Sequence, residues 1–148
     1  MAVALPYADT SFLIALHGND VFTEAARAEV LSLGTALVMS DLSELEYRNA
    51  LRLLCFRKLI TAQDLKTRLA SFQKDRDAGR LRHQLADWPM VWSLAEAIST
   101  KRTAKERHRM ADLLHVALAQ SLGVKHFLSF DDRQRKLAMR QGMAVNAL

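Results

Sequence analysis

Apolar residues along this chain follow two alternating patterns, one typical of short buried strands and one typical of helices. Apolar runs of strand length lie at residues 3–7, 36–39, 81–85, 126–130 and 143–146. Apolar positions recur at helical spacing over residues 23–33, 42–58, 61–75, 91–101, 111–122 and 131–141. Gly34 and Gly123 directly follow two of these segments, and glycine is the preferred residue just beyond a helix. The pattern therefore predicts strands that alternate with helices.

Such alternation favours βαβ units, in which parallel strands are joined by helices that cover both faces of a sheet. We expect an α/β fold, a three-layer α/β/α sandwich whose central, mostly parallel sheet has about five short strands. We find no repeat or linker, so residues 1–148 are predicted to form a single domain.

Three helical regions lead to more specific expectations. Residues 42–58 are amphipathic, and we expect the inner face of this helix to include Leu42, Leu45, Leu53, Leu54 and Phe56. Residues 111–122 are apolar nearly all round, which indicates a buried helix. Residues 101–109 are polar and strongly basic, so we expect a loop or a frayed helix there.

Composition and charge narrow the class of protein. The single cysteine, Cys55, excludes an internal disulfide framework and suits a reducing compartment. The net charge of +5 weakly favours an anionic partner. The apolar N-terminus lacks a basic region before Pro6, and Asp112 and His115 interrupt the most apolar stretch. We therefore expect a cytoplasmic protein with no membrane segment.

Acidic residues occupy positions where α/β proteins form their sites. Asp9 and Asp131 directly follow predicted strands, Asp112 opens the buried helix, and Glu46 shares a helix face with Leu42. Each aspartate taken alone could be a helix cap or a favourable charge at a helix start. Carboxylates that converge at one sheet edge would repel one another, and a divalent cation removes this repulsion. All-oxygen ligands suit Mg²⁺ or Mn²⁺, which activate water and stabilise phosphoryl oxygens.

Four segments together resemble the motifs of a known family. Residues 7–16 resemble the opening Asp-Thr-Ser motif of PIN domains, and residues 40–51 resemble the second motif with its acidic residue. Residues 111–119 resemble the third motif, an Asp-x-x-His-x-Ala helix, and residues 127–131 resemble the strand that ends in Ser-x-Asp. The order and spacing match over essentially the whole chain, whose length is similar to that of VapC-like toxins.

This resemblance implies a metal-dependent endoribonuclease with an RNA substrate, a cognate antitoxin partner and a homodimeric assembly. It implies that the catalytic and metal-binding residues are Asp9, Glu46, Asp112 and Asp131. The hydroxyls of Ser11 and Ser129 would support these carboxylates, and Mg²⁺ or Mn²⁺ would be the cofactor. The residues expected to contact RNA are Arg48, Lys105, Arg107 and Arg109.

Several neighbouring residues are competing candidates. Glu44 competes with Glu46 but is expected to point roughly opposite on the helix, and Asp132 competes with Asp131 but is expected to be a cap or solvated. For His115, a core histidine bonded to a backbone carbonyl is favoured over a metal or proton-transfer role. A haloacid-dehalogenase-type phosphatase would need an aspartate where Ser11 stands. A non-catalytic PIN-like module that binds RNA or protein remains the main alternative.

Overall fold

The computed structural model describes residues 4–148, which form helices and strands in alternation. The strands are β1 (Tyr7–Ala8), β2 (Leu37–Met39), β3 (Leu81–His83), β4 (His126–Leu128) and β5 (Ala144–Val145). The helices are α1 (Thr10–Leu16), α2 (Thr23–Leu33), α3 (Asp41–Phe56), α4 (Ala62–Asp77), α5 (Trp88–Glu106), α6 (Met110–Ser121) and α7 (Asp132–Arg140). The first strand was expected at residues 3–7, of which Val3 lies outside the described residues.

The five strands form one sheet in the order β3-β2-β1-β4-β5. Every pairing between neighbouring strands is parallel, and Tyr7 of β1 aligns with Val38 of β2 and with Phe127 of β4. The chain crosses from β1 outward to β2 and β3 and then returns to the far side of β1 for β4. The reversal in strand order therefore falls at β1, and the predicted α/β sandwich with a parallel sheet is confirmed.

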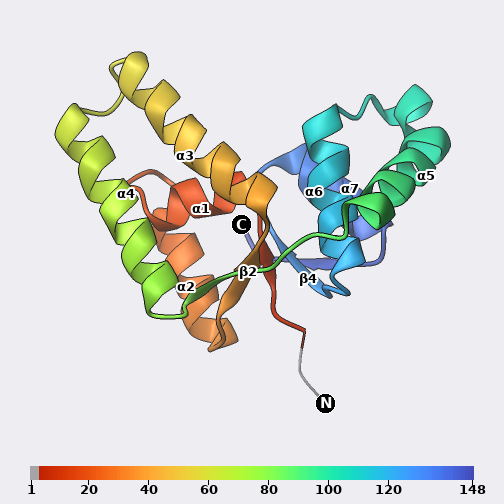
Figure 1. The fold of residues 1–148 in the computed structure, drawn as a ribbon, viewed down its shortest axis with the longest axis horizontal. Coiled ribbons are helices and arrows are strands. Elements are labelled where there is room, and N and C mark those ends of the chain that lie inside the picture. The colour runs from red at the N-terminus through yellow and green to blue at the C-terminus, as the bar shows by residue number, and fades with distance from the viewer. Residues whose placement is uncertain (1–3) are drawn as a thin grey trace.

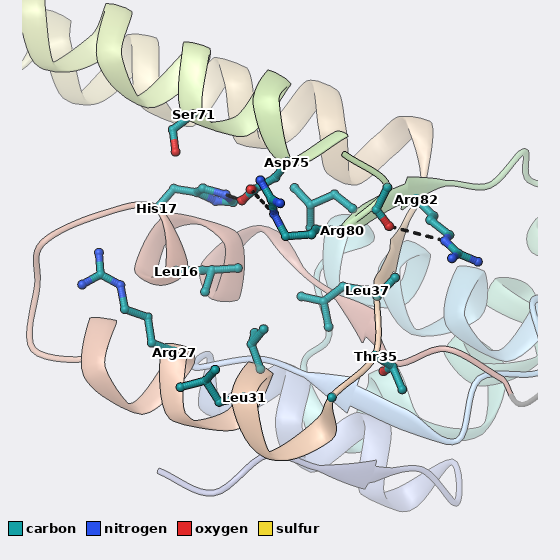
Figure 2. Close-up of a pocket in the computed structure, with 15 residues that line it drawn as sticks. Leu16, His17, Arg27, Leu31, Thr35, Leu37, Ser71, Asp75, Arg80 and Arg82 are labelled. Atoms are coloured by element: carbon teal, nitrogen blue, oxygen red, sulfur yellow. Dashed lines mark hydrogen bonds and ion pairs between the residues drawn. The ribbon is translucent and has the colours of Figure 1, made fainter. Parts of the chain in front are cut away.

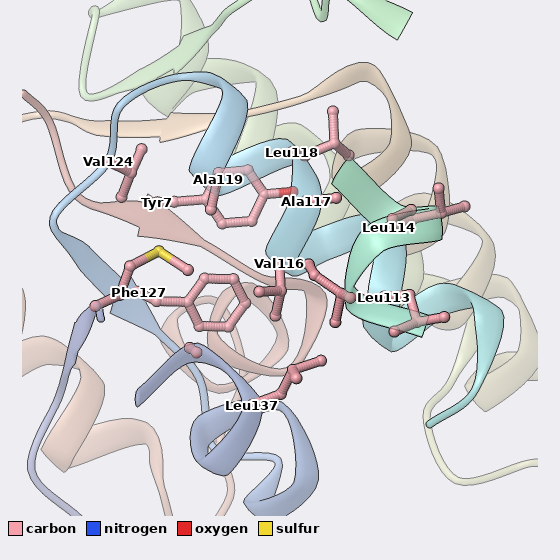
Figure 3. Close-up of a cluster of buried hydrophobic side chains, with 14 of the residues drawn as sticks. Tyr7, Leu113, Leu114, Val116, Ala117, Leu118, Ala119, Val124, Phe127 and Leu137 are labelled. Carbon is pink, nitrogen blue, oxygen red and sulfur yellow. The ribbon is translucent and has the colours of Figure 1, made fainter. Parts of the chain in front are cut away.

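Successive residues of the strands face opposite sides of the sheet and enter two separate cores. Tyr7 and Phe127 pack into one core with side chains from α5, α6 and α7 (Figure 3). Ala8 and Leu128 pack into the other core with side chains from α1, α2, α3 and α4. Figure 1 shows the two groups of helices on either side of the sheet. Because both faces of the sheet are covered, β1 and β2 are apolar throughout, as buried parallel strands usually are, whereas β3 at the edge includes the exposed Arg82 and His83.

Helix α3 buries only part of the predicted face, because Leu42 and Leu54 pack against the two cores as expected while the other three leucine and phenylalanine residues do not. Its buried side chains include Tyr47 and Leu51, whereas Leu45, Leu53 and Phe56 are 65%, 43% and 83% exposed. Tyr47 packs on Phe72 of α4, with 4.7 Å between the ring centroids. In Figure 1 the far ends of α3 and α4 project away from the sheet, so Phe56, the last residue of α3, has no core to enter.

Helix α5 is longer than the sequence predicted, because it continues to Glu106 through a segment that was expected to be a loop or frayed. Glu106 forms ion pairs with Arg102 in the same helix and with Arg140 of α7. Arg102 also donates hydrogen bonds to the side chain of Gln141 and to the carbonyl of Arg140. These contacts with the end of α7 stabilise the polar turns. None of the helices over residues 4–148 is long and apolar enough to cross a membrane.

Replacing Phe127 with alanine should strongly destabilise the protein. The side chain is fully buried and stacks on Tyr7 at a centroid distance of 5.5 Å. We expect Phe127→Ala to lower the free energy of unfolding by about 3–5 kcal/mol, as measured by urea denaturation. The matched control is Phe56→Ala, because Phe56 is 83% exposed and its loss should change stability by less than about 0.5 kcal/mol. Equal effects of the two changes would contradict the assigned core.

Candidate active site

Asp9 occupies the first turn beyond the central strand and is completely buried. Its Oδ1 atom caps α1 by accepting a hydrogen bond from the backbone N–H of Phe12 at 2.9 Å, and it also accepts one from Ser11 Oγ at 2.7 Å. Its Oδ2 atom is buried and has no hydrogen-bond partner. Burial raises the pKa of this carboxyl group. Asp9 is therefore both a helix cap and a carboxylate with one buried oxygen that can still accept a ligand.

Two serine hydroxyls link Asp9 to the end of β4. Ser11 Oγ lies 3.2 Å from Ser129 Oγ and accepts a hydrogen bond from the backbone N–H of Phe130. Ser129 Oγ in turn accepts a hydrogen bond from the backbone N–H of Asp131 at 3.0 Å. These hydroxyls thus connect the carboxyl ends of β1 and β4, and Ser11 makes the contact with a carboxylate that the sequence resemblance implied.

Asp131 and Asp112 meet at the start of α7. Asp131 Oδ1 caps this helix by accepting hydrogen bonds from the backbone N–H groups of Arg133 and Gln134, at 2.9 Å and 3.1 Å. The side-chain amide of Gln134 donates to Asp112 Oδ1 at 3.4 Å. A cavity of about 450 Å³ opens here and is lined by Arg109, Asp112, Phe130, Asp131, Asp132 and Arg133. We refer to it as the acidic cavity.

Glu46 is held by a buried histidine that the sequence did not connect to it. His115 is fully buried in α6, and its Nε2 atom hydrogen-bonds Glu46 Oε2. The hydrogen bond from His115 lowers the pKa of Glu46, and an ionised carboxylate can only accept, so Nε2 is the donor. The other ring nitrogen lies 3.0 Å from the hydroxyl of Tyr7, which also contacts Ser40.

The expected backbone-carbonyl partner of His115 is therefore wrong. A histidine within a helix that is apolar nearly all round signals a need for buried polar partners, but the sequence does not say which residues supply them. The partners come from β1 and α3, which lie far from His115 in the sequence.

Glu44, the competitor of Glu46, has a separate set of partners. Its carboxylate accepts a hydrogen bond from Arg76 of α4 at 2.6 Å and pairs with Arg48 at 3.0 Å. The side chain of Glu44 is 12% exposed and that of Glu46 is 39% exposed, so the more buried glutamate is the one committed to ion pairs. Glu44 therefore joins α3 to α4, while Glu46 faces α6. The two glutamates do lie on different sides of the helix, as expected, but Glu44 is on the more buried side.

The basic residues predicted to contact RNA lie in different surroundings. Arg48 pairs with Glu44, and its guanidinium lies over the ring of Phe72 at 5.7 Å from the centroid. Arg109 lines the acidic cavity, and Lys105 and Arg107 are exposed at the end of α5. Arg109 thus stands beside the carboxylates, whereas Arg48 is engaged in packing between α3 and α4.

Asp112 and Asp131 line the same cavity, Ser11 and Ser129 link Asp9 to the turn at Asp131, and His115 of α6 binds Glu46. The four predicted carboxylates nevertheless do not form a closed metal site. Over residues 4–148, no three His, Cys, Asp or Glu side chains stand close enough together to hold a metal ion. Each acid is instead engaged by a local donor, such as His115 for Glu46 and Gln134 for Asp112. Oxygen ligands suit a hard divalent cation, and the unpartnered Oδ2 of Asp9 is the atom that most needs one.

A larger cavity, of about 660 Å³, lies away from these acids (Figure 2). It opens between α2, α4 and the first residues of β2 and β3, including Leu37 and Leu81. Asp75 accepts hydrogen bonds there from His17 at 2.8 Å and from Arg80 at 2.7 Å. These bonds tie the end of α1 to α4, so His17, Asp75 and Arg80 already have a structural role.

A family model described as the PIN domain matches residues 7–139, which is most of the chain. The protein therefore belongs to the PIN domain family, as the motifs of its sequence indicated. The match extends from β1 into α7 and so includes all four carboxylates of the site.

Solved structures with the same fold include proteins of two bacteria. The chain is 17% identical to VapC20 of Mycobacterium tuberculosis, a sarcin–ricin-loop-cleaving toxin, and the match covers 96% of this chain and 99% of that one with a TM-score of 0.69. It is also 17% identical to FitAcB of Neisseria gonorrhoeae, with 97% of each chain covered and a TM-score of 0.68. No curated protein matches the sequence significantly. At these identities the likeness establishes a shared fold.

The metal-free protein should become more stable at neutral pH when Asp9 is replaced by asparagine. Burial raises the pKa of Asp9 in the folded protein, so the ionised carboxylate opposes folding. The free energy of unfolding therefore falls as the pH rises from the ordinary pKa of an aspartate to the raised pKa. Asparagine keeps the oxygen that caps α1, whereas Asp9→Ala removes it and should cost about 1 kcal/mol or more. Urea denaturation in EDTA should show the advantage of Asp9→Asn growing with pH. An Asp9→Asn protein less stable than wild type at pH 7 would contradict this account.

Proposed function

We propose that this PIN-domain protein is a metal-dependent endoribonuclease that hydrolyses RNA phosphodiester bonds. The observation that carries the proposal is the buried carboxylate of Asp9, whose Oδ2 atom has no hydrogen-bond partner, while its Oδ1 atom accepts from Ser11, which contacts Ser129 at the same edge of the sheet. A buried oxygen without a hydrogen-bond partner destabilises the fold, and natural proteins keep such an oxygen where a ligand binds it. A cation bound by Asp9 in a nuclease site would explain why this oxygen has no partner within the protein.

The carboxylates would hold Mg²⁺ or Mn²⁺, with Asp9 and Asp112 as the more buried ligands and Glu46 and Asp131 at the rim. A divalent cation bound there supplies Lewis-acid chemistry, since it polarises a phosphoryl oxygen and lowers the pKa of water. The chain itself holds the carboxylates in place. Ser11 and Ser129 orient Asp9 and the turn at Asp131, and His115 orients Glu46.

Basic residues would bring the RNA backbone to this edge. Arg109 lines the acidic cavity, and Lys105 and Arg107 extend the positive charge along the end of α5. Arg48 is the weakest of the predicted RNA contacts, because Glu44 already pairs with its guanidinium. Neutralisation of phosphates by these side chains would make RNA binding weaken steeply as salt rises.

We further propose that the protein acts in the cytoplasm as the toxin of a toxin–antitoxin pair. The supporting observations are membership of the PIN domain family, the shared fold with VapC20, which is a toxin, and the sequence resemblance to VapC-like toxins. A cognate antitoxin and a homodimeric assembly belong to this proposal, as they do to the resemblance. A small antitoxin gene beside the gene for this protein would favour the toxin role over housekeeping RNA processing.

Wild-type protein should cleave structured RNA in the presence of Mn²⁺, and chelation by EDTA should abolish cleavage. Asp9→Asn and Asp112→Asn should each lower the cleavage rate by more than about 100-fold, because ligands matter more than the outer residues that cost about 10- to 100-fold. Asp77→Asn is the matched control, since Asp77 is exposed at the end of α4, does not line the acidic cavity and should leave the rate nearly unchanged when replaced. Cleavage that survives both changes sinks the assigned site. RNA binding without any cleavage by wild type would favour a non-catalytic module.

Glutamine substitutions at positions 44 and 46 should have opposite consequences. Glu46→Gln should reduce cleavage strongly and change stability little, because glutamine can still accept the hydrogen bond from His115. Glu44→Gln should keep most of the cleavage but lower the free energy of unfolding by about 1–3 kcal/mol, because Arg76 and Arg48 lose their anionic partner. Cleavage rates and urea denaturation of both variants test this prediction. Strong loss of cleavage in Glu44→Gln and loss of stability alone in Glu46→Gln would contradict it.

A further inference from the structure

Three phenylalanine rings form a continuous stack from the core to the surface. Phe12 is fully buried and stacks on Phe130 with 5.5 Å between centroids and an interplanar angle of 7°. Phe22 stacks on Phe130 at 4.7 Å with an angle of 17°. Phe22 is nevertheless 39% exposed, so the last ring of the stack is in contact with water.

The backbone around Phe22 is fixed rather than loose. Asp20 Oδ1 accepts a hydrogen bond from the backbone N–H of Phe22 at 2.8 Å. Thr23 Oγ1 accepts one from the backbone N–H of Asp20 at 2.9 Å and contacts the same carboxylate. Helix α2 begins directly after this turn. The exposed ring is therefore presented in one place by a turn that is closed on itself.

The stack stands beside the acidic cavity. Phe130 lies between Ser129 and Asp131 in the sequence, its backbone N–H donates to Ser11, and it lines the cavity together with Asp112. Two arginines, Arg109 and Arg133, line the same cavity. Carboxylates for a cation, guanidinium groups for a phosphate and an aromatic surface thus adjoin one another on a small part of the molecule.

We propose that Phe22, supported from behind by Phe130, stacks on an unpaired base of the RNA whose backbone enters the acidic cavity. The inference rests on the proposed ribonuclease function and adds a residue that binds the substrate. Every base has a π face, so an aromatic platform holds RNA without strong sequence preference. Bases within a duplex are already stacked on their neighbours, so this platform selects RNA that is single-stranded at that position.

The alternative to base stacking is a purely structural role, in which Phe22 covers the ring of Phe130 and keeps it away from water. Leucine could provide such a cover, because it is apolar and of similar size, but it has no aromatic face on which a base could stack. Tyrosine and tryptophan keep the face. Substitution by leucine on one side and by tyrosine on the other therefore separates the two roles.

The proposal is tested in Asp9→Asn protein, the background, which should bind RNA without cutting it. Fluorescence anisotropy measures the affinity of this background and of its Phe22 variants for short unpaired oligoribonucleotides. We expect Phe22→Ala and Phe22→Leu to weaken binding by about 5- to 150-fold, the range that base–aromatic stacking supplies. Phe22→Tyr should bind nearly as the background does. Phe56→Ala is the matched control, since Phe56 is 83% exposed at the far end of α3 and should have no effect.

Two further measurements distinguish base stacking from other contacts. An oligomer of abasic ribose phosphates should bind Phe22→Ala and the background equally, because only the base contacts Phe22. The emission of Phe22→Trp should be quenched when base-containing RNA is added, whereas that of Phe56→Trp should not, after subtraction of the signal from Trp88 and Trp92.

Unchanged RNA affinity in Phe22→Ala, or full affinity in Phe22→Leu, would falsify the stacking role and leave the ribonuclease proposal standing. A failure of wild type and background alike to bind any RNA would instead contradict the proposed function itself, and the stacking role with it. Thermal unfolding of each variant checks that the loss of affinity does not come from loss of the fold.

Discussion

The parallel pairing of β1 with both β2 and β4 holds the residues beyond these strands at one edge of the sheet. Asp9, Ser40 and Ser129 each follow one of the three strands directly, and each lies fully buried there. β1 is only two residues long, so a shift of its register by one residue would exchange Tyr7 and Ala8 between the two cores. Burial on both faces thus fixes the register, and the register fixes the site.

The same polar side chains end the strands, begin the helices and form the site. Asp9 caps α1, Ser40 caps α3 and Asp131 caps α7. A cap uses only one oxygen of a carboxylate, so Asp9 keeps a second oxygen for another purpose. The explanation of Asp9 as a helix cap and its explanation as a ligand are therefore compatible, because the two carboxylate oxygens serve different partners.

Buried polar groups outside the carboxylates connect the layers of the sandwich. His115 of α6 reaches Tyr7 of β1 and Glu46 of α3, so one side chain joins both helical layers and the central strand. Burial raises the pKa of Tyr7, and its hydroxyl consequently stays protonated and can donate within this network. Such a network is favourable only when its members are all paired, so it favours a single arrangement of these three elements.

The sequence alone determined the class of fold, and it singled out four carboxylates as candidates for the site. Short apolar runs alternating with helical segments specified the parallel sheet, because its central strands are buried on both faces. The order of the motifs indicated the family that matches residues 7–139. The inner face of α3 and the length of α5 were not determined, because both depend on partners far along the chain, such as Phe72 for Tyr47 and Arg140 for Glu106.

Only the tertiary structure decided which polar groups meet. It paired Glu46 with His115 and Glu44 with Arg76, and it placed Phe22 on Phe130 beside the acidic cavity. Spacing along a helix shows which residues share a face, but it does not show what that face packs against. The candidate carboxylates were therefore proposed from the sequence, whereas the side chains that orient them depend on contacts that only the folded chain creates.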